Sequence, residues 1–523
     1  MSLNTSLSIA SSGLSAVQYE LAVASQNVAN ASTPGYVTEI ANVASRDTGG
    51  NGGGVVIQLT TLAVNDTLQN SLYTENATVA GLGVTVNALN AVSAVQGSTS
   101  ADATASNTLA DNLGNLQNSF TALDVDPSNA VDQQAVVSSA SALAGSIQTL
   151  STTYQSQRQG AEQAIPSEVD QINGSLNTIG SLSQQIIQLH AMGSDTADLE
   201  NQRTAAMSTL SGVLNVKFTE TSTGDMLVST ANGLNLPTRA SSGPLSAQTM
   251  TVGVADAYPG SIPGIMLNGQ DVTTSLSGGK LGANIALRDT ILPTMQAELD
   301  SFSATLATRF SGQGLTLFTD GSGNGPGADP KAGAPGGQLG FSGSIQVNAA
   351  VTADAALVRD GTQAIQDPTV GAAPVAGAVL TGASAFTPNP TGGPVGFTTL
   401  IARILNNALG TTLTTGVTQA AAASTGLGAN GTLSAPYGGT GSLAALATTL
   451  TGSQAQTIAN AAAQQSTQSD IQTTLQVNLT SASGVSVDNQ MANVVALQNA
   501  YEANAKVVSA VQTMFSALLA AIT

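Results

Sequence analysis

The chain has 523 residues, of which 42% are hydrophobic and only 8% are charged, and its formal net charge is −19. Because an ordinary soluble domain has roughly 25% charged residues, most of the polar surface here must come from Ser, Thr, Asn, Gln and Gly. The 12 basic residues argue against nucleic-acid binding, which needs Lys and Arg to neutralise phosphates. The acidic balance also argues against binding to an anionic membrane surface. Cysteine is absent, which excludes disulfides and thiolate metal sites.

The N-terminal residues do not resemble a secretory signal peptide. The first basic residue is Arg46, so no basic segment precedes an apolar one. No stretch approaches the ~18 uninterrupted apolar residues of a membrane span. We therefore expect no membrane segment, and if the protein leaves the cell, a dedicated exporter must carry it.

A long helix with a heptad stripe is predicted at the N-terminal end. Apolar residues recur at alternating spacings of four and three, which places them on one seam of a helix. The pattern stops at Thr33-Pro34-Gly35, because proline forces the preceding residue out of the helical region. The residues predicted to form this assembly seam are Leu3, Leu7, Leu14, Val17, Leu21 and Val28.

The C-terminal end carries a second helix of the same kind. Ser486 is its predicted N-cap, and Asp488 lies in the first turn, where the helix dipole favours a negative charge. Asn504 is the single polar residue in its stripe. The other seam residues are Val494, Leu497, Tyr501, Val508, Val511, Phe515, Leu518 and Ile522.

Neither terminal helix is expected to be stable by itself. Burying one apolar stripe does not offset the conformational entropy lost when a whole helix becomes ordered in water. The two helices could pair with each other, with neighbouring subunits, or with both. An ordinary intramolecular bundle, with both ends packed into one core, remains the alternative on periodicity alone.

The body of the chain is predicted to be mainly helical, with a change of composition near its end. Three apolar stripes and a β-hairpin over 213–233 support this assignment. The stripes are Leu113, Leu116, Phe120 and Leu123; Ile172, Leu176, Ile179, Leu182, Ile186 and Leu189; and Leu287, Ile291, Met295, Leu299, Phe302, Leu306 and Phe310. From about residue 320 to 450 Gly, Pro, Ala and Thr predominate, which favours short strands between loops.

We therefore predict an α+β multidomain fold. It combines coiled-coil-like terminal helices with a mainly helical trunk and a β-rich outer insertion. The predicted segments are 1–60, an N-terminal assembly helix and linker; 61–315, a helical trunk with a β-hairpin; 316–450, a Gly/Pro/Thr-rich β-type insertion; 451–486, a return helix of the trunk; and 487–523, a C-terminal assembly helix.

No catalytic, cofactor or metal site is predicted. His190 is the only histidine, so it has no second His or Cys with which to share a metal or activate a thiol. The glycines between 49 and 54 precede a predicted strand over 55–59 rather than a helix. This context, without Gly-Lys-Ser/Thr, argues against a phosphate loop. We expect no enzymatic activity and no cofactor.

Two terminal motifs carry a resemblance to a known class of proteins. The segment 27–36, with Asn27, Asn30, Thr33, Pro34, Gly35 and Tyr36 as its motif residues, resembles the N-terminal signature of flagellar rod, hook and hook-associated proteins. The segment 497–508 is similar to the C-terminal signature of the same class. Within that class, the stretches 195–218, 277–289 and 483–488 resemble the family of the first hook-associated protein. Asn489 and Gln490 depart from that family, which usually has acidic residues there.

The resemblance implies a self-assembling structural protein of the bacterial flagellum that links hook to filament. It implies self-association in a ring, contacts with hook protein and with a filament-side hook-associated protein, and an export chaperone. It also implies an extracellular location in the flagellum, reached by type III export without a cleaved signal peptide.

Two other functions remain open at this point. A hook or distal-rod protein would share the terminal motifs but would lack the long helical trunk over 110–215. An acidic surface-layer or adhesin protein would share the low charge and the absence of cysteine. It should also show β-repeats and an export signal, and neither is visible in this sequence.

Overall fold

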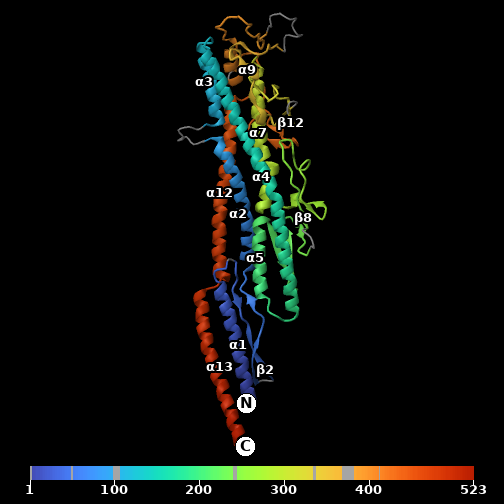
Figure 1. Cartoon of the computed structure of the whole chain (residues 1–523), viewed down its shortest axis with the longest axis vertical. Helices are drawn as coiled ribbons and strands as arrows, with labels where there is room; N and C mark the ends of the chain where they lie inside the picture. Colours follow the sequence, from blue (N-terminus) through green and yellow to red (C-terminus); the bar gives the residue numbers. More distant parts are fainter. Residues whose placement is uncertain are drawn as a thin grey trace.

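The structure is a computed structural model that describes residues 3–33, 35–48, 51–97, 107–239, 244–333, 337–367, 382–410 and 413–522. The molecule is long and narrow, with two parts stacked along its length (Figure 1). We call residues 3–62 and 487–522 the arm, and residues 66–483 the trunk. Both ends of the chain lie at the lower tip of the arm (Figure 1).

The arm consists of two long helices and a small β-structure. Helix α1 (Leu3–Asn30) and helix α13 (Val487–Ile522) run antiparallel, since both chain ends are at the same tip (Figure 1). The antiparallel strands β2 and β3 lie against α1, where the main-chain N–H of Val55 donates to Ser12 Oγ at 3.1 Å. Helix α1 therefore lies between α13 and the strands. The strands are β1 (Glu39–Ile40), β2 (Val43–Thr48), β3 (Asn51–Ile57) and β4 (Thr61–Leu62).

Long helices with clear start signals build the trunk. Thr108 and Asp111 form a complete capping box at the start of α3, and the Asn129 side chain accepts from the N–H of Val131 at the start of α4. Helix α4 has 62 residues and is therefore about 93 Å long. The helices are α2 (Asp66–Gln96), α3 (Leu109–Val125), α4 (Ala130–Ala191), α5 (Ala197–Val213) and α12 (Leu443–Ser483).

Most residues of the three predicted trunk stripes are buried, as the helical period requires. All four residues of the first stripe are at most 2% exposed. In the second stripe only Leu189 is partly exposed, and in the third only Ile291. The predicted hairpin is also confirmed, because β5 (Val216–Glu220) pairs antiparallel with β6 (Met226–Thr230).

Short elements connect α5 to the central helix α7. Gly279, at the start of α6, has φ +65° and no room for a side chain, because a Cβ there would lie 2.3 Å from the carbonyl oxygen of Val213. This glycine lets α6 pack closely on the end of α5. The elements are β7 (Asn235–Leu236), β8 (Leu245–Ser246), β9 (Met266–Leu267), β10 (Gln270–Asp271), the 3₁₀ helix η1 (Thr273–Ser275), α6 (Gly279–Ala286), the π-helical turn η2 (Leu287–Ile291) and α7 (Leu292–Ser311). Strands β5-β6-β7 and β10-β9-β8 form two three-stranded sheets.

The segment 316–450 packs onto the trunk rather than forming a separate outer domain. Its buried residues, such as Phe341 and Ile404, share one apolar core with α3, α4 and α7. Its strands are short and alternate with short helices. These elements are β11 (Phe318–Thr319), β12 (Asp329–Gly333), β13 (Gly337–Leu339), α8 (Phe341–Ser344), β14 (Gln346–Val347), α9 (Ala349–Ala353), α10 (Leu357–Asp360), α11 (Thr399–Arg403), the π-helical turn η3 (Ile404–Leu409), β15 (Thr425–Leu427) and β16 (Leu433–Ser434).

Helix α12 differs from the prediction in where it begins, and helix α2 is distinguished by its apolar composition. Helix α12 begins at Leu443, before the predicted boundary at 451, because the Ser442 side chain caps it. Among the described helices, α2 alone is long and apolar enough to cross a membrane by composition. In the trunk it contacts α4, α5, α6 and α12.

Candidate assembly interface

The predicted seam residues meet between α1 and α13, but most remain partly open to solvent. Val17 and Val511 are buried, at 8% and 4% exposure. Tyr501 and Leu518 are exposed, at 37% and 55%. The remaining described seam side chains are partly exposed: Leu7, Leu14, Leu21, Val28, Val494, Leu497, Val508 and Phe515. Leu3 and Ile522 lie in the two helices, but their side chains are outside the described structure.

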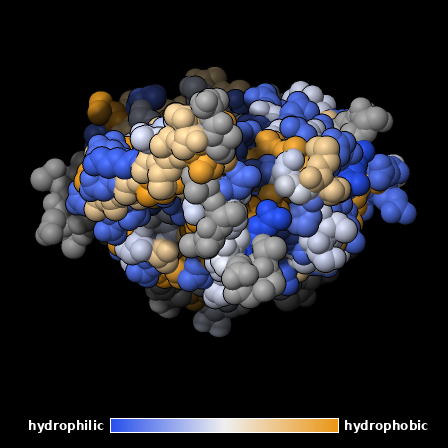
Figure 2. Space-filling view, turned by 90° about the horizontal axis from the view of Figure 1, so that it is seen from below, coloured by the Kyte–Doolittle hydropathy of each residue, from blue (hydrophilic) through white to orange (hydrophobic). Residues whose placement is uncertain are grey.

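Helix α13 also exposes apolar side chains that α1 does not cover. Val507 and Met514 are 47% and 52% exposed, and they lie seven residues apart on one face of the helix. Val495 and Leu519 are 55% and 62% exposed on other faces. Viewed from below, apolar patches reach the surface among polar ones (Figure 2). When the apolar surface of a helix extends outside its interface with one partner, the remaining surface can bind a second partner.

Asn27 is the central residue of the N-terminal motif. It is 1% exposed, and its side chain binds both main-chain groups of Glu39: Nδ2 donates to the carbonyl at 2.8 Å, and the N–H donates to Oδ1 at 2.9 Å. The Tyr36 hydroxyl donates to the same Oδ1 at 3.2 Å. Asn27 therefore fixes the path of the chain where it leaves α1.

The other motif residues shape the turn at the end of α1. Asn30 Nδ2 donates to the carbonyl of Gln26 at 3.1 Å, and Thr33 Oγ1 donates to Asn30 Oδ1 at 3.4 Å. Gly35 has φ +79°, a left-handed conformation that glycine adopts without strain. Pro34 lies outside the described residues.

Polar side chains of α5 and of the residues just before it hold the arm to the trunk. Asn201 is 8% exposed and binds Val37 twice: the N–H donates to Asn201 Oδ1 at 2.9 Å, and Asn201 Nδ2 donates to the carbonyl at 3.2 Å. Gln26 Nε2 donates to Asp198 at 2.7 Å, and Thr60 Oγ1 donates to Asp195. We call this set of contacts the neck. Hydrophobic periodicity missed Asn201, although it lies within the stretch that carried the family resemblance.

Acidic groups gather at the neck. Burial raises the pKa of Glu39, the nearby Asp198 raises it further, and hydrogen bonds from Asn201 and Tyr36 act in the opposite direction. The Asn201 Nδ2 group donates to Glu39 Oε1 at 3.1 Å. The neck is therefore built on hydrogen bonds between polar groups rather than on an apolar core.

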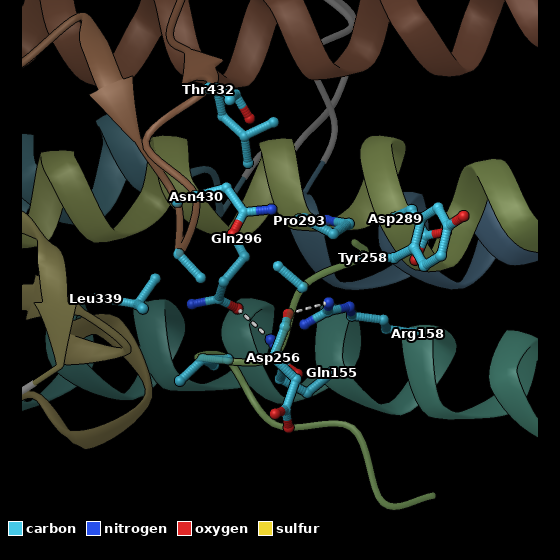
Figure 3. Close-up of a pocket in the computed structure, with 15 residues that line it drawn as sticks. Gln155, Arg158, Asp256, Tyr258, Asp289, Pro293, Gln296, Leu339, Asn430 and Thr432 are labelled. Carbon is cyan, nitrogen blue, oxygen red and sulfur yellow. Dashed lines mark hydrogen bonds between the residues drawn. The ribbon is translucent and has the colours of Figure 1, made fainter. Parts of the chain in front are cut away.

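A small cavity of about 50 Å³ lies in the trunk beside α4 and α7 (Figure 3). The charged side chains at and beside the cavity bind one another or the main chain. Arg158 donates to the carbonyls of Gly253 and Asp256, at 2.8 and 2.6 Å, and Arg288 forms a bidentate ion pair with Asp289 at 2.7 and 2.8 Å. These groups tie the loop around 253–258 to the helices, which is a structural role.

Potential metal ligands in the part of the chain that the structure describes, residues 3–522 with the gaps given above, are Asp and Glu side chains and His190. No cluster of His, Asp and Glu there could hold a metal ion. His190 is exposed near the end of α4.

Three family models match the chain: one matches part of the trunk, and the other two match the regions of the two arm helices. Residues 98–328 match the flagellar hook-associated protein FlgK helical domain. Residues 478–521 match the flagellar basal body rod FlgEFG protein C-terminal region, and residues 7–36 match the flagella basal body rod protein.

Curated relatives agree with these matches. The chain is 25% identical over 315 residues to flagellar hook-associated protein 1 of Escherichia coli strain K12, covering 58% of this chain and 56% of the relative. It is 26% identical over 327 residues to the protein of the same name from Salmonella typhimurium, covering 58% and 55%. The chain thus spans about half the length of the curated relatives it matches. The solved structure of the flagellar hook junction protein FlgK from Burkholderia pseudomallei aligns with a TM-score of 0.38 and 24% identity, over 49% of this chain and 46% of that one.

Rod-type sequences in both arm helices, together with the unsatisfied apolar surface of the arm, define an axial protein of the bacterial flagellum. The trunk match points to one member of this class: the chain is similar to the flagellar hook-associated protein 1 (FlgK) family. This is a family of structural proteins, and the similarity implies a place in the flagellum.

Proposed function

We propose that this protein joins hook to filament in the bacterial flagellum as a structural, non-enzymatic subunit. The observation that carries the proposal is the exposed apolar surface of the arm, in helices that match rod-protein sequences. Val507, Met514 and Leu518 on α13 are each about half exposed, at 47%, 52% and 55%. Such a surface is stabilised when further protein covers it. The trunk match to the hook-associated helical domain favours the junction over the hook or the rod.

The partners proposed are copies of the same chain in a ring, hook protein on one side and a filament-side hook-associated protein on the other. The protein would reach its extracellular position through flagellar type III export, with an export chaperone and without cleavage of a signal peptide. The relatives' name, flagellar hook-associated protein 1, supports this assignment. The low charge of the arm is compatible with close packing between subunits.

The terminal helices are proposed to complete their folding on assembly. Val17 and Val511 are the described seam side chains that are buried in the single chain, and the others keep part of their apolar surface in water. Contacts with neighbouring subunits would bury the remainder and offset the entropy of ordering both helices. In this proposal residues 1–60 and 487–523 assemble, and residues 61–486 form the body that carries the junction surfaces.

Deletion of residues 1–30 or of residues 487–523 tests the proposal. Each truncated protein should remain soluble, keep a cooperative thermal transition from the trunk, and fail to restore motility to a strain that lacks the full-length protein. Export must be measured separately, by detecting the truncated protein in the culture medium. A truncated protein that is exported and still builds filaments would contradict the proposed role of the arm.

A further inference from the structure

The apolar seam of the arm does not by itself fix how far α1 and α13 overlap. Leu7, Leu14, Leu21 and Val28 recur at intervals of seven, and so do Tyr501, Val508 and Phe515. If one helix slides by seven residues along the other, apolar side chains again face apolar side chains. Some other feature must select a single register, because a repeating pattern is compatible with several.

One pair of residues breaks this repetition. Asn504 is the single polar residue in the α13 stripe, and Gly13 is the only glycine in α1. The two face each other: a Cβ atom on Gly13 would lie 3.4 Å from both Nδ2 and Oδ1 of Asn504. The amide of Asn504 therefore lies directly over the backbone of Gly13, close enough that a Cβ atom there would already be in van der Waals contact with it.

Each of these residues is unfavourable when considered alone. Glycine inside a helix lowers helix stability because it loses more backbone entropy than other residues. Asparagine in an apolar seam lowers pairing stability but specifies register and partner. Two unfavourable choices at one point of contact indicate a requirement other than stability.

A shift of the pair by one heptad separates these two residues. In an antiparallel pair, Asn504 would then face Ser6 or Glu20, and Gly13 would face Leu497 or Val511. The amide would lose the space it occupies over glycine, and a large apolar side chain would lie over a position that offers no side chain to pack against. Both consequences disfavour the shifted arrangement.

We infer that Gly13 and Asn504 form the register-determining pair of the arm. Their contact selects one overlap of α1 and α13, and thereby sets the height along the arm at which the exposed side chains Val507, Met514 and Leu518 are presented. This inference deepens the proposed function, on which its biological meaning rests. It concerns contacts within one chain, so it can be tested without flagellar partners.

The absence of cysteine makes a distance measurement direct. Spin labels are attached to Ser15→Cys and Ser509→Cys, which are exposed on α1 and α13, and the label separation is measured by pulsed electron spin resonance. The full-length chain is used, in a helix-stabilising osmolyte. The unsubstituted pair should give one narrow distance. Asn504→Leu should add a second distance displaced by up to about 10 Å, the length of seven helical residues.

Two further variants complete the test. The exchange Gly13→Asn with Asn504→Gly preserves a small residue opposite an amide and should restore the single distance. Asn499→Leu makes the same chemical change at an exposed position of α13 and should leave the distance unchanged. A single, unshifted distance in Asn504→Leu would overturn the inference. A broad distribution in the unsubstituted chain would also overturn it, because the two helices would then hold no register, whatever the truncation experiments show.

Discussion

At the scale of single residues, the trunk contains buried carboxyl groups bound to neutral partners. Glu298 of α7 is 6% exposed and accepts from Gln454 of α12 at 2.8 Å, and Gln454 accepts in turn from the Tyr154 hydroxyl of α4 at 2.7 Å. Burial raises the pKa of Glu298 to about 7, although the bond from Gln454 acts against this rise. Burial likewise raises the pKa of Glu168 to about 7 and that of Asp300 to about 6.

Raised carboxyl pKa values predict that the protein is more stable in mild acid. Between the ordinary glutamate pKa of 4.5 and the folded value of about 7, the folded state binds more protons than the unfolded state. The free energy of unfolding therefore falls as the pH rises through this range and stays low above it.

Glu298→Gln should remove part of this pH dependence. The amide keeps an oxygen to accept from Gln454 but carries no charge to bury, so the variant should be more stable than the wild type at pH above 7, by at most about 3 kcal/mol. Thermal unfolding at about pH 5 and at about pH 8 measures the difference. Glu502→Gln on the exposed face of α13 controls for the loss of one charge. Equal destabilisation of Glu298→Gln at both pH values would contradict the argument.

At the scale of elements, the arm and the trunk are joined by the hydrogen bonds of the neck. Asn27 and Asn201 bind alternate residues of the same extended segment, Glu39 and Val37. The first asparagine belongs to α1 and the second to α5. The segment between them is therefore held from both parts, and its hydrogen bonds set the angle at which the arm leaves the trunk.

Asn201→Ala should loosen the neck at one identifiable amide. The main-chain N–H of Val37 loses its acceptor, whereas that of Glu39 keeps Asn27. Leaving such buried groups unpaired costs about 1–3 kcal/mol. Hydrogen exchange followed by residue should show faster exchange at Val37 with Glu39 still protected. Gln202→Ala, at the exposed neighbouring position, provides the control, and unchanged exchange at Val37 would show that Asn201 does not hold it.

Apolar periodicity predicted the elements that have a regular pattern. The terminal helices, the trunk stripes and the hairpin of β5 and β6 follow from spacing alone, because one repeating face of each is buried. The neck could not be predicted in this way, since Asn27 and Asn201 are buried polar residues 174 positions apart. Most of their partners are main-chain groups, which do not appear in the side-chain pattern of the sequence.

The packing of segment 316–450 could not be predicted from the sequence pattern either. Arg309 of α7 is 2% exposed and donates to the carbonyls of Ala420 and Gly441, at 2.9 and 2.7 Å. Burial without a carboxylate partner lowers its pKa to about 10. A buried arginine that binds loop carbonyls draws a Gly-rich segment onto the trunk. Its composition alone suggested a separate outer domain.

At the scale of the whole molecule, both parts carry net negative charge, and the larger trunk carries most of it. The arm, residues 3–62 and 487–522, has five acidic and two basic residues, so most of the net charge of −19 belongs to the trunk. Copies placed side by side would therefore repel one another, mainly through their larger trunks, while the apolar surfaces of their arms favour contact.

Self-association of the full-length chain should strengthen with salt. Raising the ionic strength from about 0.01 M to 0.15 M shortens the screening length from about 30 Å to about 8 Å, which weakens repulsion between trunks. It leaves the burial of apolar arm residues largely unaffected. Sedimentation at both salt concentrations measures the change in association. Weaker association at the higher concentration would indicate that ion pairs, rather than apolar contacts, hold the subunits together.

The position of both chain ends at one tip has a consequence for biosynthesis. Helix α1 is translated before the trunk, and its partner α13 is translated after it (Figure 1). A polypeptide that stops early, or is still emerging, has the first helix without the second and cannot complete the arm. If the arm assembles as proposed, only a chain that has been translated through α13 can present a complete arm to a neighbouring subunit.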